Sequence, residues 1–317
     1  MAGVPKPVLT PMQQRNKAAK RTAAALGYNE CVTYSFIDRE AASLFGGGDD
    51  ATMLENPISL DMSHMRPGLL PGLLRAVGRN QARGFADMAL FEAGHAFQGG
   101  EPGEQHMQIA GVLVGRTGPK DVLGESRVVD VFDAKADAEA VLAAIGAPAK
   151  VQILRGAEEW WHPGRHGRIC LGPKKVMGVF GEIHPKILRE MGLKGPIVAF
   201  TLYPDEVPLP KNKTATRPAL KATDLQSVER DFAFVVDAQV EALTLVNAAA
   251  GADKALITDV RVFDEFIGGS LGEGKKSLAV TVRLQPVETT LKDAEIEAIA
   301  AKIIEKVTKA TGGVLRG

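Results

Sequence analysis

The sequence predicts an α+β fold in two parts. In the first part, segments rich in β-branched and aromatic residues outnumber the helical segments and arrive in hairpins, which favours an antiparallel sheet with helices packed on it. Residues 204–222 then hold four prolines and little hydrophobic periodicity, as linkers do. The order of strands and helices changes beyond them. We therefore expect a domain over 1–205, a linker over 206–222 and a second domain over 223–317.

The bulk composition is that of an ordinary globular protein. Of the 317 residues, 45% are hydrophobic and 24% are charged, and 38 basic residues balance 38 acidic ones. A net charge of zero gives no sign of a nucleic-acid partner, so such a site would have to be a local patch. Cys31 and Cys170 lie far apart in apolar surroundings, which favours two buried thiols in a reducing compartment. No apolar run is long enough to span a membrane and no signal-peptide core begins the chain, so we expect a cytoplasmic protein.

The amino-terminal segment is basic and contains no Asp or Glu before Glu30. Within it, QQRNKAAKRTAAAL (13–26) consists of good helix formers, and Gly27 stands where a helix C-cap belongs. ECVTYSF (30–36) follows and predicts a strand, because it is rich in β-branched and aromatic residues.

The stretch ENPISLDMSHMRPGLLPGLL (55–74) crowds acids, hydroxyls, a histidine and Arg66 in front of leucines. Pro71 can occupy the first turn of a helix whose leucines pack the core. We interpret the polar residues before it as partners for backbone groups of a loop, not as catalysts. On that helix Arg75, Arg79 and Arg83 recur every four residues and therefore stack along one side. A solvated face is the simpler interpretation, and a surface for phosphate or for a partner's acidic groups is the alternative.

The rest of the first part alternates strands with short helices. MALFEAGHAFQ (88–98) and QIAGVLV (108–114) predict strands, and DAKADAEAVLAAIG (133–146) predicts a helix with Asp at its start and Gly at its end. RICLG and VMGVFGEIH are joined by the turn GPKK and predict a hairpin over 168–184. PKILREMGL then gives a short helix and PIVAFTLY a strand that ends at Tyr203.

The second part predicts the element order βαββαβ. Its strands are RDFAFVVD, ALITDVRVFDEFI, SLAVTVRLQP and a short terminal segment in GGVLRG. Its helices are EALTLVNAAAGAD and residues 292–311, and the apolar residues of the last helix recur on one face. This order predicts a ferredoxin-like domain, in which one antiparallel sheet carries two helices on one side and leaves its other face free to bind.

Three motifs that suggest chemistry have simpler structural interpretations. His162 and His166 have the spacing of a metal-binding helix, but the Pro-Gly between them disfavours that helix, so we predict no metal site. GGSLGEGK (268–275) precedes a strand and lacks the Lys-Ser/Thr of a nucleotide loop, which favours a β-turn. Glu92 and His95 fall on opposite faces of one strand unless the glycine between them makes a bulge.

Aromatic and basic residues recur together in the second part. They are Phe232, Phe234, Phe263 and Phe266, with Arg230, Arg261, Lys275, Lys276, Arg283 and Arg316. On a sheet, such residues can stack unpaired bases, although two or three of the phenylalanines must belong to the core. Residues 206–317 hold 15 Lys and Arg against 16 Asp and Glu, so any RNA contact would be local, not a general attraction to polyanions.

Several motifs together carry a resemblance to a known family. GYNECVTYSF, ENPIS followed by HMRPGLLPGLL, RNQARG, LFEAGHAF, HPGR and FGEIHP occur in this order. They resemble the carboxy-terminal half of the bacterial phenylalanyl-tRNA synthetase β subunit. RDFAFVVD, VFDEFIGGSLGEGKKSLAVTVRLQP and ATGGVLRG are similar to its last module, the ferredoxin-fold anticodon-binding domain. The resemblance extends from about residue 12 to the end of the chain.

The resemblance implies that residues 1–205 form a class II synthetase-like module that has lost catalysis. Class II catalysis places an arginine two residues before a glutamate on the motif 2 strand, whereas LFEAG has Leu90 two places before Glu92. The third class II motif ends in an arginine after a glycine-rich strand and helix, and this chain offers VFGEIHPKIL there. Without those guanidiniums, charge that develops on phosphate and carboxyl oxygens would lack its donors. The amino-terminal half of the family's subunit, with its editing module, is missing, so we expect a truncated chain and assign it no editing.

The implied role is that of a non-catalytic part of phenylalanine–tRNA ligase, which makes phenylalanyl-tRNA at the expense of ATP. The implied partners are the catalytic α subunit, in an α2β2 assembly, and tRNA-Phe, with no membrane; no cofactor is expected in this chain, and ATP and Mg²⁺ are expected for the whole enzyme. The tRNA contacts predicted are Arg316, Phe234, Lys275, Lys276 and Arg283. The subunit-interface residues predicted are Arg66, Arg75 and Arg79. The alternatives are a chain that is itself a ligase, and a stand-alone module that binds RNA or a small metabolite.

Overall fold

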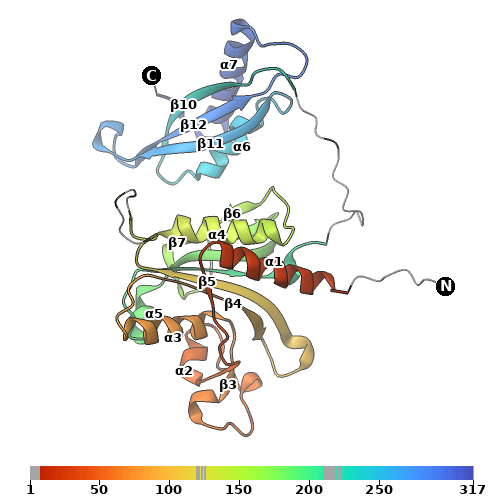
Figure 1. The fold of residues 1–317 in the computed structure, drawn as a ribbon. Helices are drawn as coiled ribbons and strands as arrows, with labels where there is room; N and C mark the ends of the chain where they lie inside the picture. The colour runs from red at the N-terminus through yellow and green to blue at the C-terminus, as the bar shows by residue number, and fades with distance from the viewer. Residues whose placement is uncertain are drawn as a thin grey trace, which may run out of the picture. The chain divides into compact units, whose positions relative to one another are not determined.

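The computed structural model describes residues 8–118, 122, 124, 126–209, 219 and 223–316, and it divides into two compact units, residues 1–214 and 215–317. The predicted α+β fold is confirmed, because each unit combines an antiparallel sheet with packed helices (Figure 1). Among the described helices, none is both long and apolar enough to cross a membrane.

The first unit is built on a seven-stranded sheet with the order β1-β4-β5-β9-β8-β7-β6. All neighbouring strands are antiparallel except β1 and β4. The strands are β1 (Asn29–Glu30), β4 (Met88–Phe97), β5 (Gln105–Val114), β6 (Gln152–Leu154), β7 (Trp161–Leu171), β8 (Lys175–Ile183) and β9 (Ile197–Leu202). A separate antiparallel pair, β2 (Phe36–Ile37) and β3 (His64–Met65), lies between β1 and β4 in sequence.

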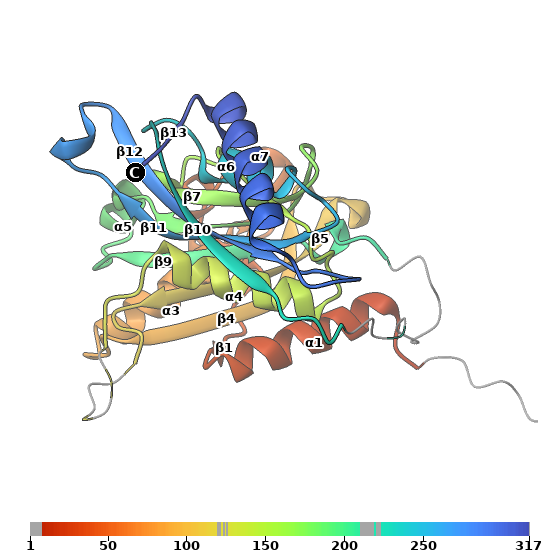
Figure 2. The ribbon, with the colours of Figure 1, turned by 90° about the horizontal axis from the view of Figure 1, so that it is seen from above.

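Helices cover both faces of this sheet. On one face α1 (Pro11–Ala25) and α4 (Val131–Ala144) lie side by side, and on the other lie α3 (Leu70–Gln81) and α5 (Pro185–Glu190), as Figures 1 and 2 show. A short helix, α2 (Arg39–Ser43), packs beside β3. Short 3-10 turns are η1 (Asp50–Thr52), η2 (Leu60–Met62), η3 (Pro102–Glu104) and η4 (Pro204–Glu206). Each face of the sheet therefore has its own hydrophobic core.

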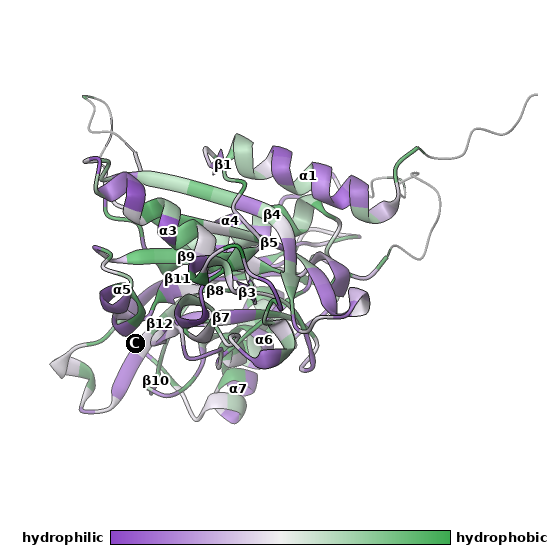
Figure 3. Cartoon of the chain, turned by 90° about the horizontal axis from the view of Figure 1, so that it is seen from below, coloured by the Kyte–Doolittle hydropathy of each residue, from purple (hydrophilic) through white to green (hydrophobic). Residues whose placement is uncertain are grey.

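Helix α1 begins two residues earlier than predicted, because Thr10 and Gln13 form a reciprocal capping box in front of Pro11. It ends as predicted, since Gly27 has a φ of 94°, which only glycine adopts without strain. Hydrophobic and hydrophilic turns alternate along it in Figure 3, and its buried alanines face α4. One buried residue on this helix is polar. Arg15 donates hydrogen bonds to the carbonyls of Pro204 (3.0 Å), Val207 (2.7 Å) and Pro208 (2.7 Å).

The strand predicted over 30–36 is only partly formed. β1 ends at Glu30 and β2 begins at Phe36, and the chain between them leaves the ladder of β4. The reason is visible at Thr33, whose N–H donates to the side-chain Oε1 of Glu92 (3.3 Å) instead of to a backbone carbonyl. Sequence periodicity also did not predict β6, α2 or the first half of β7, which begins at Trp161 and contains a register shift.

The second unit has the predicted βαββαβ order and the ferredoxin-like layout, which are both confirmed. Its elements are β10 (Val228–Asp237), α6 (Ala242–Ala250), β11 (Ile257–Phe266), β12 (Lys275–Leu284), α7 (Asp293–Thr311) and β13 (Val314–Leu315). The sheet order is β11-β12-β10-β13, and all of its pairs are antiparallel. Both helices contribute to the core on one face of the sheet. The glycine-rich turn connects β11 to β12 through η5 (Gly269–Leu271), as the β-turn interpretation predicted.

The predicted linker begins inside the packed part of the first unit. Val207 is buried in the core beneath α1, and Arg15 binds the carbonyl of Pro208, so that unit extends at least to Pro208. Residues 210–218 and 220–222 of the predicted linker lie outside the described residues.

Candidate functional site

The second unit presents a sheet face that its helices leave uncovered. Residues on β10 and β12 alternate, so that Phe232, Val236 and Val280 are buried against the helices while their neighbours point the other way. The uncovered face has short side chains at its centre, at Ala233 and Ala279. A flat centre of this kind leaves room for a side chain from the edge of the sheet to lie across it.

An arginine and a phenylalanine meet on this face. The backbone N–H of Arg316 donates to the carbonyl of Ala233 (2.8 Å), which places Arg316 just beyond β13 at one edge of the sheet. Phe266 lies on β11 at the opposite edge, paired with Ser277. The Arg316 guanidinium carbon nevertheless stands 5.8 Å from the centre of the Phe266 ring. The arginine side chain must therefore extend across the short residues in the middle of the face.

Further charged groups lie on the same face. Arg283 on β12 pairs with Asp259 on β11, and Arg261 pairs with Thr281, so both arginines share the face of Phe266. Lys275 is exposed and forms an ion pair with Asp237 at 2.5 Å. The predicted contacts Arg316, Arg283 and Lys275 are thus brought to one surface, and Phe266 and Arg261 join them there.

Two of the predicted contacts are wrong. Phe234 has 0% of its surface exposed and packs between the sheet and the helices, where no base can reach it. Lys276 is also buried, on β12 opposite Val236 of β10. Its ammonium group forms an ion pair with Glu265 at 3.1 Å. The alternation in RDFAFVVD could have predicted that Phe234 is buried, because Phe234 lies two residues from Phe232 and from Val236 and therefore on the same face of the strand.

The first unit carries apolar side chains on its outside. They lie on segments 32–36 and 53–60 and are Val32, Tyr34, Phe36, Met53, Ile58 and Leu60. Val32 is 90% exposed and Ile58 is 95% exposed. The β2–β3 pairing and a bridge between Met53 and His64 hold these segments together. We call these six residues the outer apolar patch. Exposed apolar groups in such number are typical of a protein–protein contact.

Beneath segment 32–36 lies a buried ion-pair cluster. Arg66 donates from Nη1 to Glu92 Oε1 (2.8 Å) and to Thr33 Oγ1 (3.0 Å), and from Nε to the carbonyl of His95 (2.9 Å). The hydroxyl of Thr33 donates in turn to Glu92 Oε2 (2.7 Å). Arg66 is only 4% exposed, so the prediction that it lies at a subunit surface is wrong. A guanidinium bound below the surface acts on a partner only through the residues that it positions.

Of the three arginines predicted on one helix, Arg75 and Arg79 lie on α3, whereas Arg83 lies in the turn after the helix ends at Gln81. Arg75 is half-buried and forms an ion pair with Asp38, the N-cap of α2. Burial, and then the nearby charge of Arg79, lower the pKa of Arg75. Arg79 and Arg83 are exposed. Of the predicted interface residues, Arg79 is therefore the one whose charge faces outward.

The pairs that suggested chemistry are held in structural roles. The β4–β5 register runs without a bulge through Gly94, so Glu92 is buried while His95 is exposed on the other side, as expected. His162 and His166 lie on β7, not on a helix, and His166 Nδ1 is 2.7 Å from the carbonyl of His162. Neither pair has the arrangement of an acid–base couple or of a metal site.

A cavity of about 670 Å³ lies over β5 and β9 on the α3 side of the sheet. Gln108 accepts the Leu69 N–H (3.3 Å) through its oxygen, so its amide nitrogen faces His106 and donates to Nε2 (2.8 Å). Burial lowers the pKa of His106 and favours its neutral form. Acidic, aromatic and lysine side chains line the cavity, and no arginine does among the described residues.

Two family models match the chain. The model described as phenylalanyl tRNA synthetase beta chain CLM domain matches residues 2–203, and the one described as ferredoxin-fold anticodon binding domain matches residues 223–316. The first match alone covers more than half of the chain. The chain belongs to the phenylalanyl-tRNA synthetase β-chain family.

Relatives in this family match almost the whole chain. The phenylalanine–tRNA ligase β subunit of Ruegeria pomeroyi is 77% identical over 315 residues, which are 99% of this chain and 40% of the relative. That of Cereibacter sphaeroides is 69% identical over 100% of this chain and 40% of the relative. The chain thus spans about 40% of the length of these relatives. A solved pyrrolysyl tRNA synthetase of Desulfitobacterium hafniense is 14% identical with a TM-score of 0.46, over 62% of this chain and 64% of that one.

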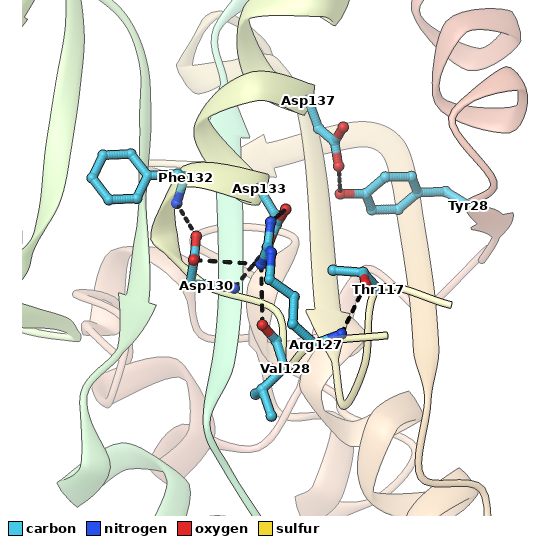
Figure 4. A network of polar contacts seen from close by, with 8 residues as sticks. All are labelled: Tyr28, Thr117, Arg127, Val128, Asp130, Phe132, Asp133 and Asp137. Carbon is cyan, nitrogen blue, oxygen red and sulfur yellow. Dashed lines mark hydrogen bonds and ion pairs between the residues drawn. The ribbon is translucent and has the colours of Figure 1, made fainter. Parts of the chain in front are cut away.

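In this family member a second polar network lies at the start of α4 (Figure 4). Arg127 binds both carboxylate oxygens of Asp133 at 2.7 Å, and this hydrogen-bonded pairing lowers the pKa of Asp133. The Tyr28 hydroxyl donates to Asp137 (2.7 Å). Burial raises the pKa of Asp137, and the bond from Tyr28 partly offsets that shift. These charges find partners within the chain, and the bond from Tyr28 ties α4 to the segment just after α1.

Proposed function

We propose that the chain is the carboxy-terminal, non-catalytic part of a phenylalanine–tRNA ligase β subunit, with functional domains at 1–205 and 223–317. The first domain would support the catalytic α subunit, and the second would bind the anticodon region of tRNA-Phe. The observation that carries the proposal is the match of two successive family models, in the order expected for this subunit, over almost all of the chain.

The uncovered face of the second unit is the surface that we assign to tRNA. Arg316 over Phe266 offers a cation and an aromatic ring to a splayed base, and Arg283 and Arg261 lie beside them to meet phosphates. Asp237 and Asp259 on the same face disfavour loose binding of any polyanion. The face is therefore suited to a specific, local contact with an unpaired loop.

The test is Arg316→Ala in the assembled ligase, with the Michaelis constant for tRNA-Phe as readout. Loss of one stacking and charge contact is expected to raise that constant by about tenfold. Lys306→Ala is the matched control, because Lys306 is an exposed cation on helix α7, on the opposite side of the sheet. An unchanged constant for Arg316→Ala would remove the residue from the site. Equal binding of tRNA-Phe and of a tRNA with another anticodon would favour a general RNA-binding module instead.

The outer apolar patch and the exposed charge of Arg79 support the proposed contact with the α subunit. Burying the patch would remove apolar surface from water, which is the main driving force of stable subunit association. Mixing the chain with the α subunit and measuring the mass of the product tests this contact. An α2β2 assembly is the proposed product for the intact enzyme.

We propose that the chain by itself makes no aminoacyl-adenylate. Leu90 stands where class II catalysis needs a phosphate-binding arginine, and it is a buried apolar residue that cannot bind a phosphate. Glu92 is bound by Arg66 and Thr33 inside the chain. We assign ATP and Mg²⁺ to the whole enzyme and no cofactor to this chain. Phenylalanine-dependent exchange of pyrophosphate into ATP tests this, and exchange by the chain alone would show that it is itself a ligase. We place the enzyme in the cytoplasm.

A further inference from the structure

We infer that the buried cluster of Thr33, Arg66 and Glu92 is a positioning device that fixes segment 31–36 and so presents the outer apolar patch to the α subunit. The inference rests on the proposed contact with α. The first half of the inference states that side chains, not a backbone ladder, hold the segment. This half concerns the chain alone.

The backbone ladder stops where the cluster begins. β1 pairs with β4 at Asn29 and Glu30, and the N–H of Cys31 still donates to the carbonyl of Phe91 (2.7 Å). At Thr33 the N–H meets the Glu92 carboxylate instead. From there to β2, the only backbone bond is from the Arg66 N–H to the carbonyl of Ser35 (2.8 Å), among the described residues. The side-chain carboxylate of Glu92 and one residue of a distant loop, Arg66, thus replace the ladder.

The segment alternates between the cluster and the outside. Cys31, Thr33 and Ser35 are partly buried, whereas Val32, Tyr34 and Phe36 are exposed. This two-residue period is that of a chain in extended form. Because inward and outward side chains alternate, the anchoring of Thr33 directly sets the direction of Val32 and Tyr34. Two of the six residues of the outer apolar patch therefore depend on it, whereas Phe36 is also held by its pairing with Met65 in β3.

Neighbouring glycines make room for the cluster. A Cβ at Gly94 would lie 2.6 Å from Arg66 Nη2, and a Cβ at Gly72 would lie 2.3 Å from Thr33 Oγ1. The guanidinium and the hydroxyl therefore fill space that any other residue would close. The cluster binds together segment 31–36, the loop before α3, α3 itself and β4.

A buried ion pair is weak evidence of added stability. Replacing a buried ion pair with apolar groups of similar volume is often neutral or stabilising, so its value lies in the geometry that it imposes. Here the imposed geometry is that of an exposed apolar segment, which would otherwise collapse onto the protein surface. Positioning of a docking surface is the role that this arrangement fits.

The test compares Thr33→Val, which keeps the shape and removes the hydroxyl, with Thr33→Ser, which keeps the hydroxyl. Hydrogen exchange of the residue 33 amide in the full chain is the first readout, and the affinity for the α subunit is the second. Thr33→Val is expected to speed exchange and to weaken association, each by about tenfold, because two hydrogen bonds of the cluster are lost. Thr33→Ser is expected to stay near the wild type in both.

Arg15→Met is the matched control, because Arg15 is also buried and triply hydrogen-bonded but lies on α1. It is expected to lower stability while it leaves exchange at residue 33 and association with α unchanged. Wild-type exchange at residue 33 in Thr33→Val would overturn the inference. Equal weakening of association by Arg15→Met and Thr33→Val would also overturn it. If the wild-type chain showed no association with α, the proposed function would fail, and exchange would still decide whether the cluster holds the segment.

Discussion

Replacing Gly72 with alanine has two opposing effects on stability, a gain in helix propensity and a loss from overpacking. Gly72 lies in the first turn of α3, where alanine would ordinarily be preferred. Alanine is expected to stabilise a helix by up to about 1 kcal/mol relative to glycine. An added Cβ, however, would stand 2.3 Å from Thr33 Oγ1 and 2.9 Å from Thr33 Cβ. Both are shorter than any ordinary contact.

Thr33 cannot give way without breaking the cluster. Its Oγ1 donates to Glu92 and accepts from Arg66, and its branched side chain is stiff about χ1. Overpacking at such a position costs about 1–3 kcal/mol. A contact of 2.3 Å with a fixed side chain belongs to the upper part of that range, about 2–3 kcal/mol. Subtracting about 1 kcal/mol for the gain in helix propensity, we expect Gly72→Ala to lower the free energy of unfolding of the first unit by about 1–2 kcal/mol.

Urea denaturation followed by tryptophan fluorescence measures this change, because both tryptophans of the chain, Trp160 and Trp161, lie in the first unit. Gly78→Ala is the matched control on the same helix. Its added Cβ would meet only the Leu193 Cδ2 atom, at 2.9 Å, and the end of a leucine side chain can move. Gly78→Ala is therefore expected to be neutral or slightly stabilising. A Gly72→Ala variant as stable as the wild type, or no less stable than Gly78→Ala, would refute the packing argument.

Three further outcomes are expected. Arg15→Met should destabilise the first unit by about 2 kcal/mol in the same urea assay, since buried carbonyls lose a charged donor, while Lys17→Met on the exposed side of α1 should change little. Burial raises the pKa of Asp137 above its ordinary value of 3.8, so its contribution to stability is present below pH 3.8 and is lost as pH rises through the folded-state pKa. Asp137→Asn should flatten that part of the curve of unfolding free energy against pH, and an unchanged curve would contradict this expectation. Gly268→Ala should weaken tRNA binding about as much as Phe266→Ala, because a Cβ there would lie 2.6 Å from the Phe266 ring and displace it; wild-type binding by both variants would exclude the ring from the site.

Local sequence patterns predicted the elements of both units well where side chains repeat with a regular period. The one-face spacing of Ile296, Ile299 and Ile303 predicted α7 to within a residue, and all three are buried. Gly27 predicted the end of α1 because a left-handed residue after a helix is nearly always glycine. The composition of segment 30–36 predicted a strand that is only partly formed. Its residues are those of a strand, but the Thr33 N–H is bound by the Glu92 side chain and not by a backbone carbonyl.

The candidate site needed more than local pattern. Arg66 sits in a polar stretch that predicts an exposed loop, and only the fold brings Glu92 and Thr33 against it, from 26 and 33 positions away. Likewise, Phe234 and Phe266 are both phenylalanines on strands beside basic residues. Strand pairing and the position of the helices decide that the first is core and that the second lies under Arg316.

The sequence by itself determined the two-part α+β organisation, the βαββαβ order and the family resemblance, because these depend on periodicity and on short motifs that are contiguous in the chain. The tertiary structure alone decided which face each charged or aromatic residue presents. A shift of one residue in register turns every side chain of a strand to the other face, and a buried ion pair forms only when distant segments meet. Hence Arg66 proved to be an internal anchor and Arg316 a surface group, although both are arginines that the sequence placed at binding surfaces.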